Sequence, residues 1–239
     1  MKLTLRSAKV THVGLVRKNN EDSAYAGRRL AAVADGMGGM PSGELASDIV
    51  MRALVPLDTS KPPRDAADVL RGALDEANRQ IRSATESDAT HDGMGTTVTS
   101  LLLAGDTITL VHIGDSRAYL WRDGAATQLT KDDTFVQSLV DQGVLTPAEA
   151  RAHPRRSIVT QAVQGDELAP EVAEMSVRIG DRFLVCSDGL SDWVSEDSIA
   201  EALGTVDDPD LCAGRLVDLA LVAGAPDNVT VVVADVVKG

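Results

Sequence analysis

The chain has 239 residues, of which 44% are hydrophobic and 25% are charged, an ordinary balance for a globular protein. This length allows one large domain or two small ones with a substantial core. The net charge of −13 and the aromatic content of 3% argue against nucleic-acid binding, which needs a basic surface and stacking platforms. A phosphate group would have to be bound against this negative field, with the help of cations or well-placed arginines.

No apolar run approaches the roughly 18 residues of a membrane helix, and the N-terminus lacks the apolar segment of a signal peptide. We therefore expect no membrane insertion by this chain. The expected location is the cytoplasm, either as a complete protein or as the cytoplasmic part of a longer membrane-anchored one. Cys186 and Cys212 lie in apolar surroundings and cannot form a disulfide framework, so we expect two buried thiols.

The first part of the chain predicts two strands followed by two helices. Mixed β-branched and polar residues at 3–13 predict a strand, and the apolar run at 30–34 predicts a strand buried on both faces that ends at Asp35. Residues 43–57 predict a helix, and Asp65 can cap a second one. The second helix has apolar residues at helical spacing, namely Leu70, Ala73, Leu74, Ala77, Ile81 and Ala84.

The middle of the chain changes to a strand-like pattern. Residues 83–95 are polar and predict a mobile connection, and turn signals at regular spacing between 96 and 130 predict an antiparallel meander. Residues 131–165 interrupt the core strands. Within this insertion, Thr146 begins a short helix through a capping box with proline at the first helical position. Because a polar, basic stretch follows at 153–157, we interpret the insertion as a flap over a cleft.

The last part of the chain returns to strands at 171–177 and 182–187, followed by helices that begin near Ser195 and Asp208. A final strand at 228–237 completes the pattern. Runs of strands separated by paired helices predict an α+β protein built in layers.

Four carboxylates stand at the ends of apolar runs. Asp35 and Asp188 each follow such a run and precede a glycine, Asp115 follows a third run, and Asp227 opens a fourth. A single Asp-Gly pair is usually only a turn. If the four acids converge, however, their mutual repulsion is costly without cations. An all-oxygen donor set without a His or Cys cluster suits Mn²⁺ or Mg²⁺ rather than zinc.

Other polar residues leave alternatives open. Arg17 is either a solvated surface base or a bidentate clamp for a phosphate. His12 and His112 fall in strand patterns and are expected to be structural. The glycine-rich stretch at 36–43 lacks the lysine of a Walker loop and the last glycine of a dinucleotide-binding turn, so neither nucleotide motif is present.

The order of these motifs resembles that of the metal-dependent type 2C protein serine/threonine phosphatases, in the form found in bacteria. Each motif is weak alone, but six in order across nearly the whole chain are specific. The motifs are Arg17-Lys18-Asn19-Asn20-Glu21-Asp22-Ser23, Asp35-Gly36-Met37-Gly38-Gly39, Gly93-Met94-Gly95-Thr96-Thr97, Gly114-Asp115-Ser116-Arg117, Ser187-Asp188-Gly189-Leu190 and Asp227-Asn228-Val229-Thr230. The resemblance implies one catalytic domain over 1–239, with two antiparallel sheets packed as a sandwich, pairs of α-helices outside and a flap at about 131–165.

The resemblance also implies a role for each candidate site residue. Two cations are expected in the core site, with a third in addition. The implied roles are Asp35 as the bridge between two cations, the carbonyl of Gly36 on one and Asp188 with Asp227 on the other, Asp115 with Asp188 on the third, Glu21 and Asp22 on metal-bound waters, Arg17 on the phosphoryl group, and Ser157 with His153 in the flap.

The activity implied is hydrolysis of phosphoserine and phosphothreonine in proteins by a metal-bridged hydroxide, without a phosphoenzyme. Its partners would be phosphorylated proteins, namely serine/threonine kinases and their substrates. Two alternatives stay open, a non-catalytic phosphoprotein-binding module and a small-molecule phosphohydrolase. Some relatives place a histidine, as a candidate general acid, where this chain has Met37. A thioether cannot donate a proton, so a metal-bound water or another group, with His153 as one candidate, would have to do so.

Overall fold

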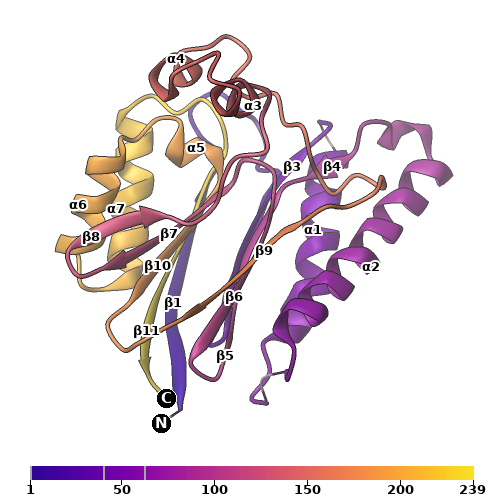
Figure 1. Ribbon diagram of the computed structural model, residues 1–239. Helices are drawn as coiled ribbons and strands as arrows, with labels where there is room; N and C mark the ends of the chain where they lie inside the picture. The colour runs from indigo at the N-terminus through magenta and orange to yellow at the C-terminus, as the bar shows by residue number, and fades with distance from the viewer. Residues whose placement is uncertain (1, 40, 62) are drawn as a thin grey trace.

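Two antiparallel β-sheets pack face to face, with helices against both outer surfaces (Figure 1). The computed structural model describes residues 2–39, 41–61 and 63–239. The predicted α+β sandwich with paired outer helices is therefore confirmed. Among the described residues, no helix combines the length and the apolar character needed to span a membrane.

The first sheet has the first and last strands of the chain side by side at one edge. Its order is β1 (Leu3–His12), β11 (Val229–Lys238), β10 (Arg182–Cys186), β7 (Arg117–Arg122) and β8 (Ala125–Gln128). The second sheet has the order β2 (Asp22–Ala26), β3 (Leu30–Met37), β5 (Val98–Ala104), β6 (Thr107–Ile113) and β9 (Glu171–Ser176), and β4 (Gly95–Thr96) pairs with β3.

The meander expected over 96–130 is not a single sheet. Its first hairpin, β5 and β6, belongs to the second sheet, whereas β7 and β8 belong to the first. The chain crosses between the sheets at 114–116, where the hydroxyls of Ser116 and Thr97 are 2.8 Å apart. Alternation and turn residues predict antiparallel hairpins, but they do not tell which sheet a hairpin joins.

Helices cover each sheet in pairs. On the second sheet lie α1 (Ser42–Leu54), extended by the 3₁₀ turn η1 (Val55–Leu57), and α2 (Ala66–Ser87). On the first sheet lie α6 (Glu196–Thr205) and α7 (Pro209–Val222). Three short helices gather at one end of the sandwich (Figure 1), namely α3 (Phe135–Asp141), α4 (Pro147–Arg151) and α5 (Asp188–Ser191).

Helix α2 forms for the reasons that its sequence suggests, but it is longer than expected. The Asp65 carboxylate accepts a hydrogen bond from the amide of Asp68, and Leu70 and Ile81 are fully buried. The mobile connection predicted at 83–95 is wrong. The helix continues to Ser87, and the 3₁₀ turn η2 (Ala89–His91) then begins with Asp88 as its cap. Polarity here marks an exposed helix end rather than a mobile loop.

Three apolar layers hold the sandwich together. The central layer lies between the sheets, one outer layer joins the second sheet to α1 and α2, and the other joins the first sheet to α6 and α7. The two chain ends pair at Leu3 and Lys238, at the end of the sandwich opposite α3 and α4 (Figure 1). The end that carries the short helices is also where β3, β6 and β10 stop. Asp35 lies inside β3, which runs on to Met37 instead of ending at Asp35 as predicted, whereas Asp115 and Asp188 follow β6 and β10, and these acids meet at this end.

Arg182 provides a test of how the first sheet is joined to its helices. This arginine is 8% exposed, and its Nε lies 2.6 Å from Asp235 Oδ1 on β11, while Nη1 donates to the carbonyl of Leu203 at the end of α6. We expect Arg182→Met to lower the free energy of unfolding by about 3 kcal/mol, because Asp235 keeps only the exposed Arg6 as a cationic partner and the carbonyls of Leu203 and Val206 lose their donor.

Urea denaturation measures this loss. The matched control is Arg52→Met, which removes an exposed pair with Asp48 on α1 and should change stability by less than about 1 kcal/mol. Equal effects of the two substitutions would contradict the role assigned to Arg182.

Candidate metal centre

One cavity brings the predicted acids together. It has a volume of about 550 Å³ and opens at the end of the sandwich where the strands stop. Its lining includes Arg17, Glu21, Asp35, Gly36, Asp115, Ser157, Asp188 and Asp227. Eight of the ten predicted site residues thus face one cavity although they are spread over more than 200 positions of the sequence.

Asp35 and Asp22 come from neighbouring strands of the second sheet. They are opposite each other in the β2–β3 pair. The amide of Asp35 donates to the Thr97 hydroxyl at 3.1 Å, and its carbonyl accepts from the Thr97 amide at 2.9 Å. These two hydrogen bonds fix the backbone of Asp35 whatever its carboxylate contacts.

Asp188 and Asp227 come from the first sheet. Asp188 opens α5 directly after β10, and Asp227 lies two residues before β11. A Cβ atom on Gly189 would lie 1.9 Å from the carbonyl oxygen of Asn228, so only glycine allows α5 to approach this segment. The Ser187 hydroxyl donates to Asp22 Oδ2 at 2.9 Å. This bond joins the two sheets, although neither Ser187 nor Asp22 is part of the cavity lining.

Asn228 holds the loop that carries Arg17. Its side-chain amide donates to the carbonyls of Val13 and Asn19 at 3.0 and 2.8 Å, and its side-chain oxygen accepts from the amide of Glu21 at 2.8 Å. Arg17 Nη2 donates to Asp227 Oδ2 at 2.7 Å, while the arginine side chain stays 57% exposed. Asn228 belongs to the motif Asp227-Asn228-Val229-Thr230, but its role in holding this loop was missed. No pattern along the chain shows which backbone groups its side chain reaches.

The carboxylates disturb one another strongly. Burial raises the pKa of Asp35 well above its usual range, and the charges of Asp22 and Asp188 raise it further. Burial, followed by the charges of Asp115 and Asp192, does the same to the pKa of Asp188. Burial also raises the pKa of Asp115 to about 7 and that of Asp22 to about 6. The protein alone thus holds these acids in a state that disfavours full ionisation near neutral pH.

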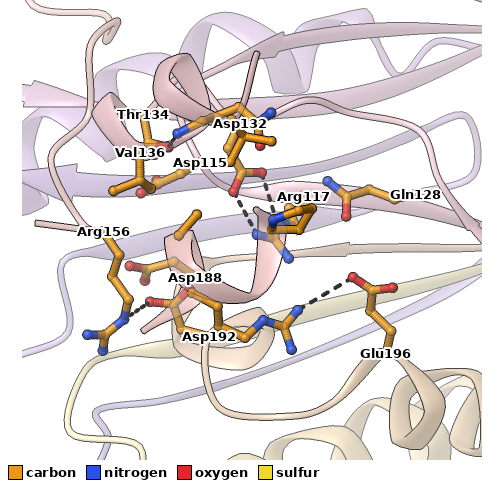
Figure 2. A pocket seen from close by; sticks show the side chains of 15 residues that line it. Asp115, Arg117, Gln128, Asp132, Thr134, Val136, Arg156, Asp188, Asp192 and Glu196 are labelled. Carbon is orange, nitrogen blue, oxygen red and sulfur yellow. Dashed lines mark hydrogen bonds and ion pairs between the residues drawn. The ribbon is translucent and has the colours of Figure 1, made fainter. Parts of the chain in front are cut away.

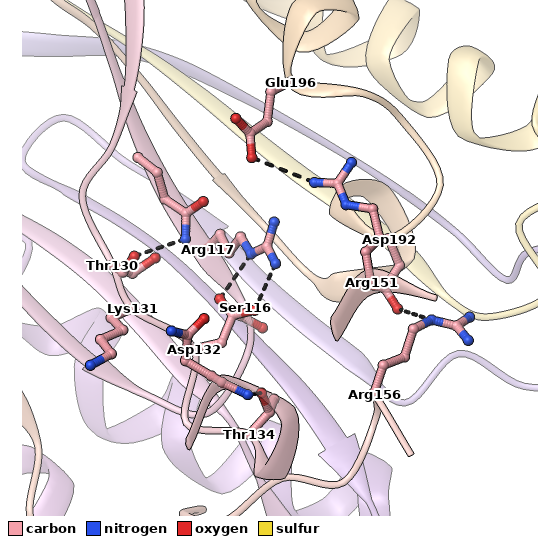
Figure 3. Close-up of polar contacts among 12 residues, drawn as sticks. Ser116, Arg117, Thr130, Lys131, Asp132, Thr134, Arg151, Arg156, Asp192 and Glu196 are labelled. Atoms are coloured by element: carbon pink, nitrogen blue, oxygen red, sulfur yellow. Dashed lines mark hydrogen bonds and ion pairs between the residues drawn. The ribbon is translucent and has the colours of Figure 1, made fainter. Parts of the chain in front are cut away.

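A second, smaller cavity adjoins the first beneath the 131–165 segment. It has a volume of about 210 Å³ and shares Asp115 and Asp188 with the main cavity (Figure 2). Arg117 is buried there and pairs with Asp132 through two hydrogen bonds of 2.8 and 2.7 Å (Figure 3). Asp192 also faces this cavity. It was missed from the sequence, although its position four residues after Asp188 places both on one side of a helical turn.

The 131–165 segment is attached at its base and at its outer part. At its base, Asp133 exchanges hydrogen bonds with Gly114, the residue before Asp115. Farther out, Arg156 Nε lies 3.0 Å from Asp192 Oδ2, and its guanidinium carbon is 6.0 Å from the centre of the Trp193 ring (Figure 2). The capping box predicted at Thr146 is confirmed. Ser157 and Val159 of this segment line the main cavity.

Comparison with known proteins agrees with this geometry. The model of the family described as "Protein phosphatase 2C" matches residues 17–209. The serine/threonine protein phosphatase PstP of Mycobacterium tuberculosis is 54% identical over 235 residues, which cover 98% of this chain and 46% of PstP. The chain belongs to the protein phosphatase 2C family. It spans about half the length of this curated relative.

A second relative and two solved structures match over more than nine-tenths of their own chains. The protein phosphatase PhpP of Streptococcus pneumoniae is 36% identical, with 93% of this chain and 94% of PhpP covered. A crystal structure of M. tuberculosis PstP superposes with a TM-score of 0.94 at 53% identity, covering 97% of this chain and 98% of that one. The catalytic domain of PstP in complex with two manganese ions superposes with a TM-score of 0.93 at 52% identity, covering 99% of this chain and 100% of that one.

The donor set of this phosphatase 2C chain fits a hard divalent cation. All the candidate ligands are oxygens, as Mn²⁺ and Mg²⁺ prefer. Asp22 Oδ1 is buried and has no hydrogen-bond partner among the described residues, which leaves an acceptor for a cation or for water held by one. In residues 2–39, 41–61 and 63–239, however, no three His, Cys, Asp or Glu side chains form a ready-made metal site. The acids share a cavity without meeting at one point, and Arg17 holds Asp227.

The remaining histidine predictions can be compared with the structure. His153 packs against the Phe135 ring at 6.3 Å, and its Nδ1 accepts from the amide of Arg155. It is not part of the cavity lining, so its geometry does not support a role as proton donor. His12 accepts from the amide of Gly14, and the buried His112 contacts Thr99, as expected of structural histidines.

The raised pKa values predict how stability responds to pH in the absence of metal. The folded protein binds these protons more tightly than the unfolded chain, so stability falls as pH rises from about 4 through the pKa values of about 6 for Asp22 and about 7 for Asp115. We expect Mn²⁺ to raise the melting temperature more at about pH 7.5 than at about pH 5.5, because ionised carboxylates bind it.

Asp188→Asn separates this effect from general charge effects. Removing one repelling charge should raise the metal-free melting temperature by a few degrees, since ~1 kcal/mol corresponds to about 2–4 °C in a domain of this size. The variant should also lose most of the Mn²⁺-induced rise. Asp75→Asn, at an exposed position of α2, is the control and should leave both quantities unchanged. A Mn²⁺ response of equal size in the Asp188 variant would contradict the assignment.

Proposed function

We propose that this chain hydrolyses phosphoserine and phosphothreonine in proteins with the help of Mn²⁺ or Mg²⁺. The observation that carries the proposal is the shared cavity, which five carboxylates and Arg17 line together in a chain of the phosphatase 2C family. The two manganese ions in the related PstP domain support it. We further propose that the catalytic unit covers residues 1–239 and that the 131–165 segment is its flap.

The proposed division of the acids is the one that the resemblance to the phosphatase 2C family implies. Asp35 would bridge two ions, with the carbonyl of Gly36 on one of them and Asp188 with Asp227 on the other. Glu21 and Asp22 would hold water around them, and Asp115 with Asp188 would take a third. Bound Mn²⁺ or Mg²⁺ would neutralise the acids and lower the pKa of water, which supplies a nucleophile near neutral pH.

Arg17 suits the binding of the phosphoryl group. The hydrogen bond to Asp227 raises the pKa of Arg17, so its charge is permanent. That bond uses one of the five N–H donors of the guanidinium. The other donors, on a side chain that is 57% exposed, remain available for the oxygens of a phosphate. Arg17 can therefore bind the substrate without leaving Asp227.

Neither the cysteines nor His112 is placed to act as the nucleophile of a phosphoenzyme. Both cysteines are buried, and burial raises the pKa of Cys186 to about 12. His112 is enclosed by Thr99 and by the carbonyl of Lys131. We therefore propose direct attack by water on phosphorus rather than transfer to one of these side chains. Met37 lines the cavity and cannot protonate the leaving oxygen, so that proton would come from water held in the cavity.

The cellular setting is inferred from the same chemistry. We propose phosphorylated proteins as the partners, both serine/threonine kinases and their substrates, and the cytoplasm as the location. The negative charge of −13 disfavours anionic partners at long range. A phosphoprotein therefore has to be captured locally, by Arg17 and the bound cations.

Hydrolysis of a phosphothreonine peptide tests the proposal. Phosphate release should require Mn²⁺ or Mg²⁺ and stop with EDTA. Asp35→Asn should lower kcat by at least about 100-fold, the scale of losing one major electrostatic contribution to a transition state. Asp75→Asn should keep full activity. Metal-independent release would overturn the mechanism.

The same assay distinguishes the two alternatives. Tight binding of the peptide without turnover would indicate a binding module. Faster hydrolysis of a nucleotide or sugar phosphate than of the peptide would indicate a small-molecule enzyme. The proposed function requires the peptide to be the better substrate.

The ion pair between Arg156 and Asp192 tests the proposed flap. The Arg156 and Asp192 side chains are largely covered, at 35% and 22% exposed. Arg151, on the same segment as Arg156, pairs with Glu196 of α6, and these two side chains are 46% and 64% exposed (Figure 3). Arg156→Met should raise KM for a phosphopeptide by about 3- to 10-fold, because a partly covered ion pair contributes of the order of 1 kcal/mol.

Arg151→Met is the matched control and should change KM less than about twofold, as expected for an exposed pair. Trp193 fluorescence should change in the Arg156 variant only, since Arg156 lies over that ring. If both variants have the same KM as the parent, residues 131–165 are not a flap that contacts the substrate.

A further inference from the structure

Three apolar side chains from separate elements line the otherwise charged cavity. They are Val16 in the loop before β2, Met37 at the end of β3 and Val159 in the 131–165 segment. We call these three residues the apolar rim. A single exposed valine is ordinary on a protein surface. Three apolar side chains around one opening that also contains Arg17 call for another explanation.

Val16 is the most exposed member of the apolar rim, at 71%. Its neighbour Leu15 is 59% exposed, so two adjacent apolar side chains face solvent beside the cavity. Next to Val159, Ile158 is 47% exposed. Exposed apolar surface therefore continues outward from the opening on both the loop side and the side of the 131–165 segment.

The backbone on either side of Val16 is fixed. The amide of Leu15 donates to the carbonyl of Ala225 at 3.0 Å, and the amide of Arg17 donates to the carbonyl of Pro226 at 3.3 Å. Asn228 holds both ends of the loop through Val13 and Asn19. An exposed apolar residue on a mobile loop would lose entropy on binding, whereas this one is already in place. Valine is also stiff at χ1.

The other two members are fixed as well. Val159 forms an isolated antiparallel bridge with Thr134, and Met37 pairs with Gly95 in the β3–β4 ladder. The apolar rim is therefore a preformed surface with two rigid members and one flexible thioether, which can adapt to different side chains.

The occupant follows from the position of Val16 beside Arg17. Val16 directly precedes Arg17 in the chain. If Arg17 binds the phosphoryl group, the substrate residues next to the phosphorylated one therefore pass close to Val16. An acidic neighbour would face the negative floor of the cavity and the net charge of the chain. An aliphatic neighbour would instead cover apolar surface, at no electrostatic cost.

We infer that the apolar rim selects phosphoprotein segments that carry an aliphatic side chain next to the phosphorylated residue. This inference rests on the proposed function and adds a substrate class to it. Val16 is then a specificity-determining residue, and Met37 is an apolar contact at a position where a proton donor is absent.

Two phosphothreonine peptides of equal length and charge test the inference, one with leucine and the other with serine at both positions next to the phosphothreonine. The wild-type chain should show a kcat/KM at least about fivefold higher for the leucine peptide, since an apolar contact at an open surface discriminates less than a closed pocket does. Val16→Ser should reduce this ratio towards one, and Val16→Leu should maintain it.

Val222→Ser is the matched control, because Val222 is 87% exposed at the end of α7 and is not part of the cavity lining. It should keep the wild-type ratio. The ratio within each variant cancels any general change in activity. Equal hydrolysis of the two peptides by the wild type, or an unchanged ratio in Val16→Ser, overturns the inference while the proposed function stands. Hydrolysis of neither peptide overturns both.

Discussion

Repulsion among carboxylates that cannot move apart is the constraint on which this structure depends. Asp22 and Asp35 are set side by side by the register of β2 and β3, and Asp188 is brought to them by β10. Each of these strands is fixed by apolar layers on both faces of its sheet. The bond between Ser187 and Asp22 joins the two sheets beside these acids. The packing of the sandwich therefore offsets the cost of a site that is unfavourable by itself, as is common where stability and function compete.

The arginines of this end of the sandwich reduce that repulsion without removing it. Arg117 and Arg156 are each bound to an acid that faces the smaller cavity, Asp132 and Asp192. Arg17 differs from these two, because its side chain is bonded to Asp227 and remains 57% exposed. The fixed positive charge of Arg17 next to the acids reduces the electrostatic repulsion that an approaching anion meets in a chain of negative net charge. The excess of acids over bases that remains in the cavity is what divalent ions would neutralise.

Most elements of the fold could be predicted because their signals are local. Capping residues such as Asp65 and Thr146 mark helix starts directly, and apolar runs such as 30–34 mark the strands that end in acids. The assignment of hairpins to sheets could not be predicted, since the turn residues that mark the β5–β6 and β7–β8 hairpins do not tell which sheet each hairpin joins. The cavity itself was predicted from acids at strand ends together with the family resemblance. The bond of Arg17 to Asp227 and the clamp formed by Asn228 were not, because they join residues about 210 positions apart that share no pattern.

The layout of the cavity separates the chemistry from the recognition of the substrate. The floor consists of charged groups, and the ions it would bind interact with phosphoryl oxygens that are the same in every phosphoserine or phosphothreonine. Interactions common to all substrates lower the barrier for all of them and cannot discriminate. Discrimination therefore has to come from the parts of the opening that touch the polypeptide, which are the loop around Val16 and the 131–165 segment. Because these parts are anchored by Asn228, Asp133 and Arg156 to the same strands and helices that carry the acids, recognition can differ between proteins of this fold without disturbing the floor.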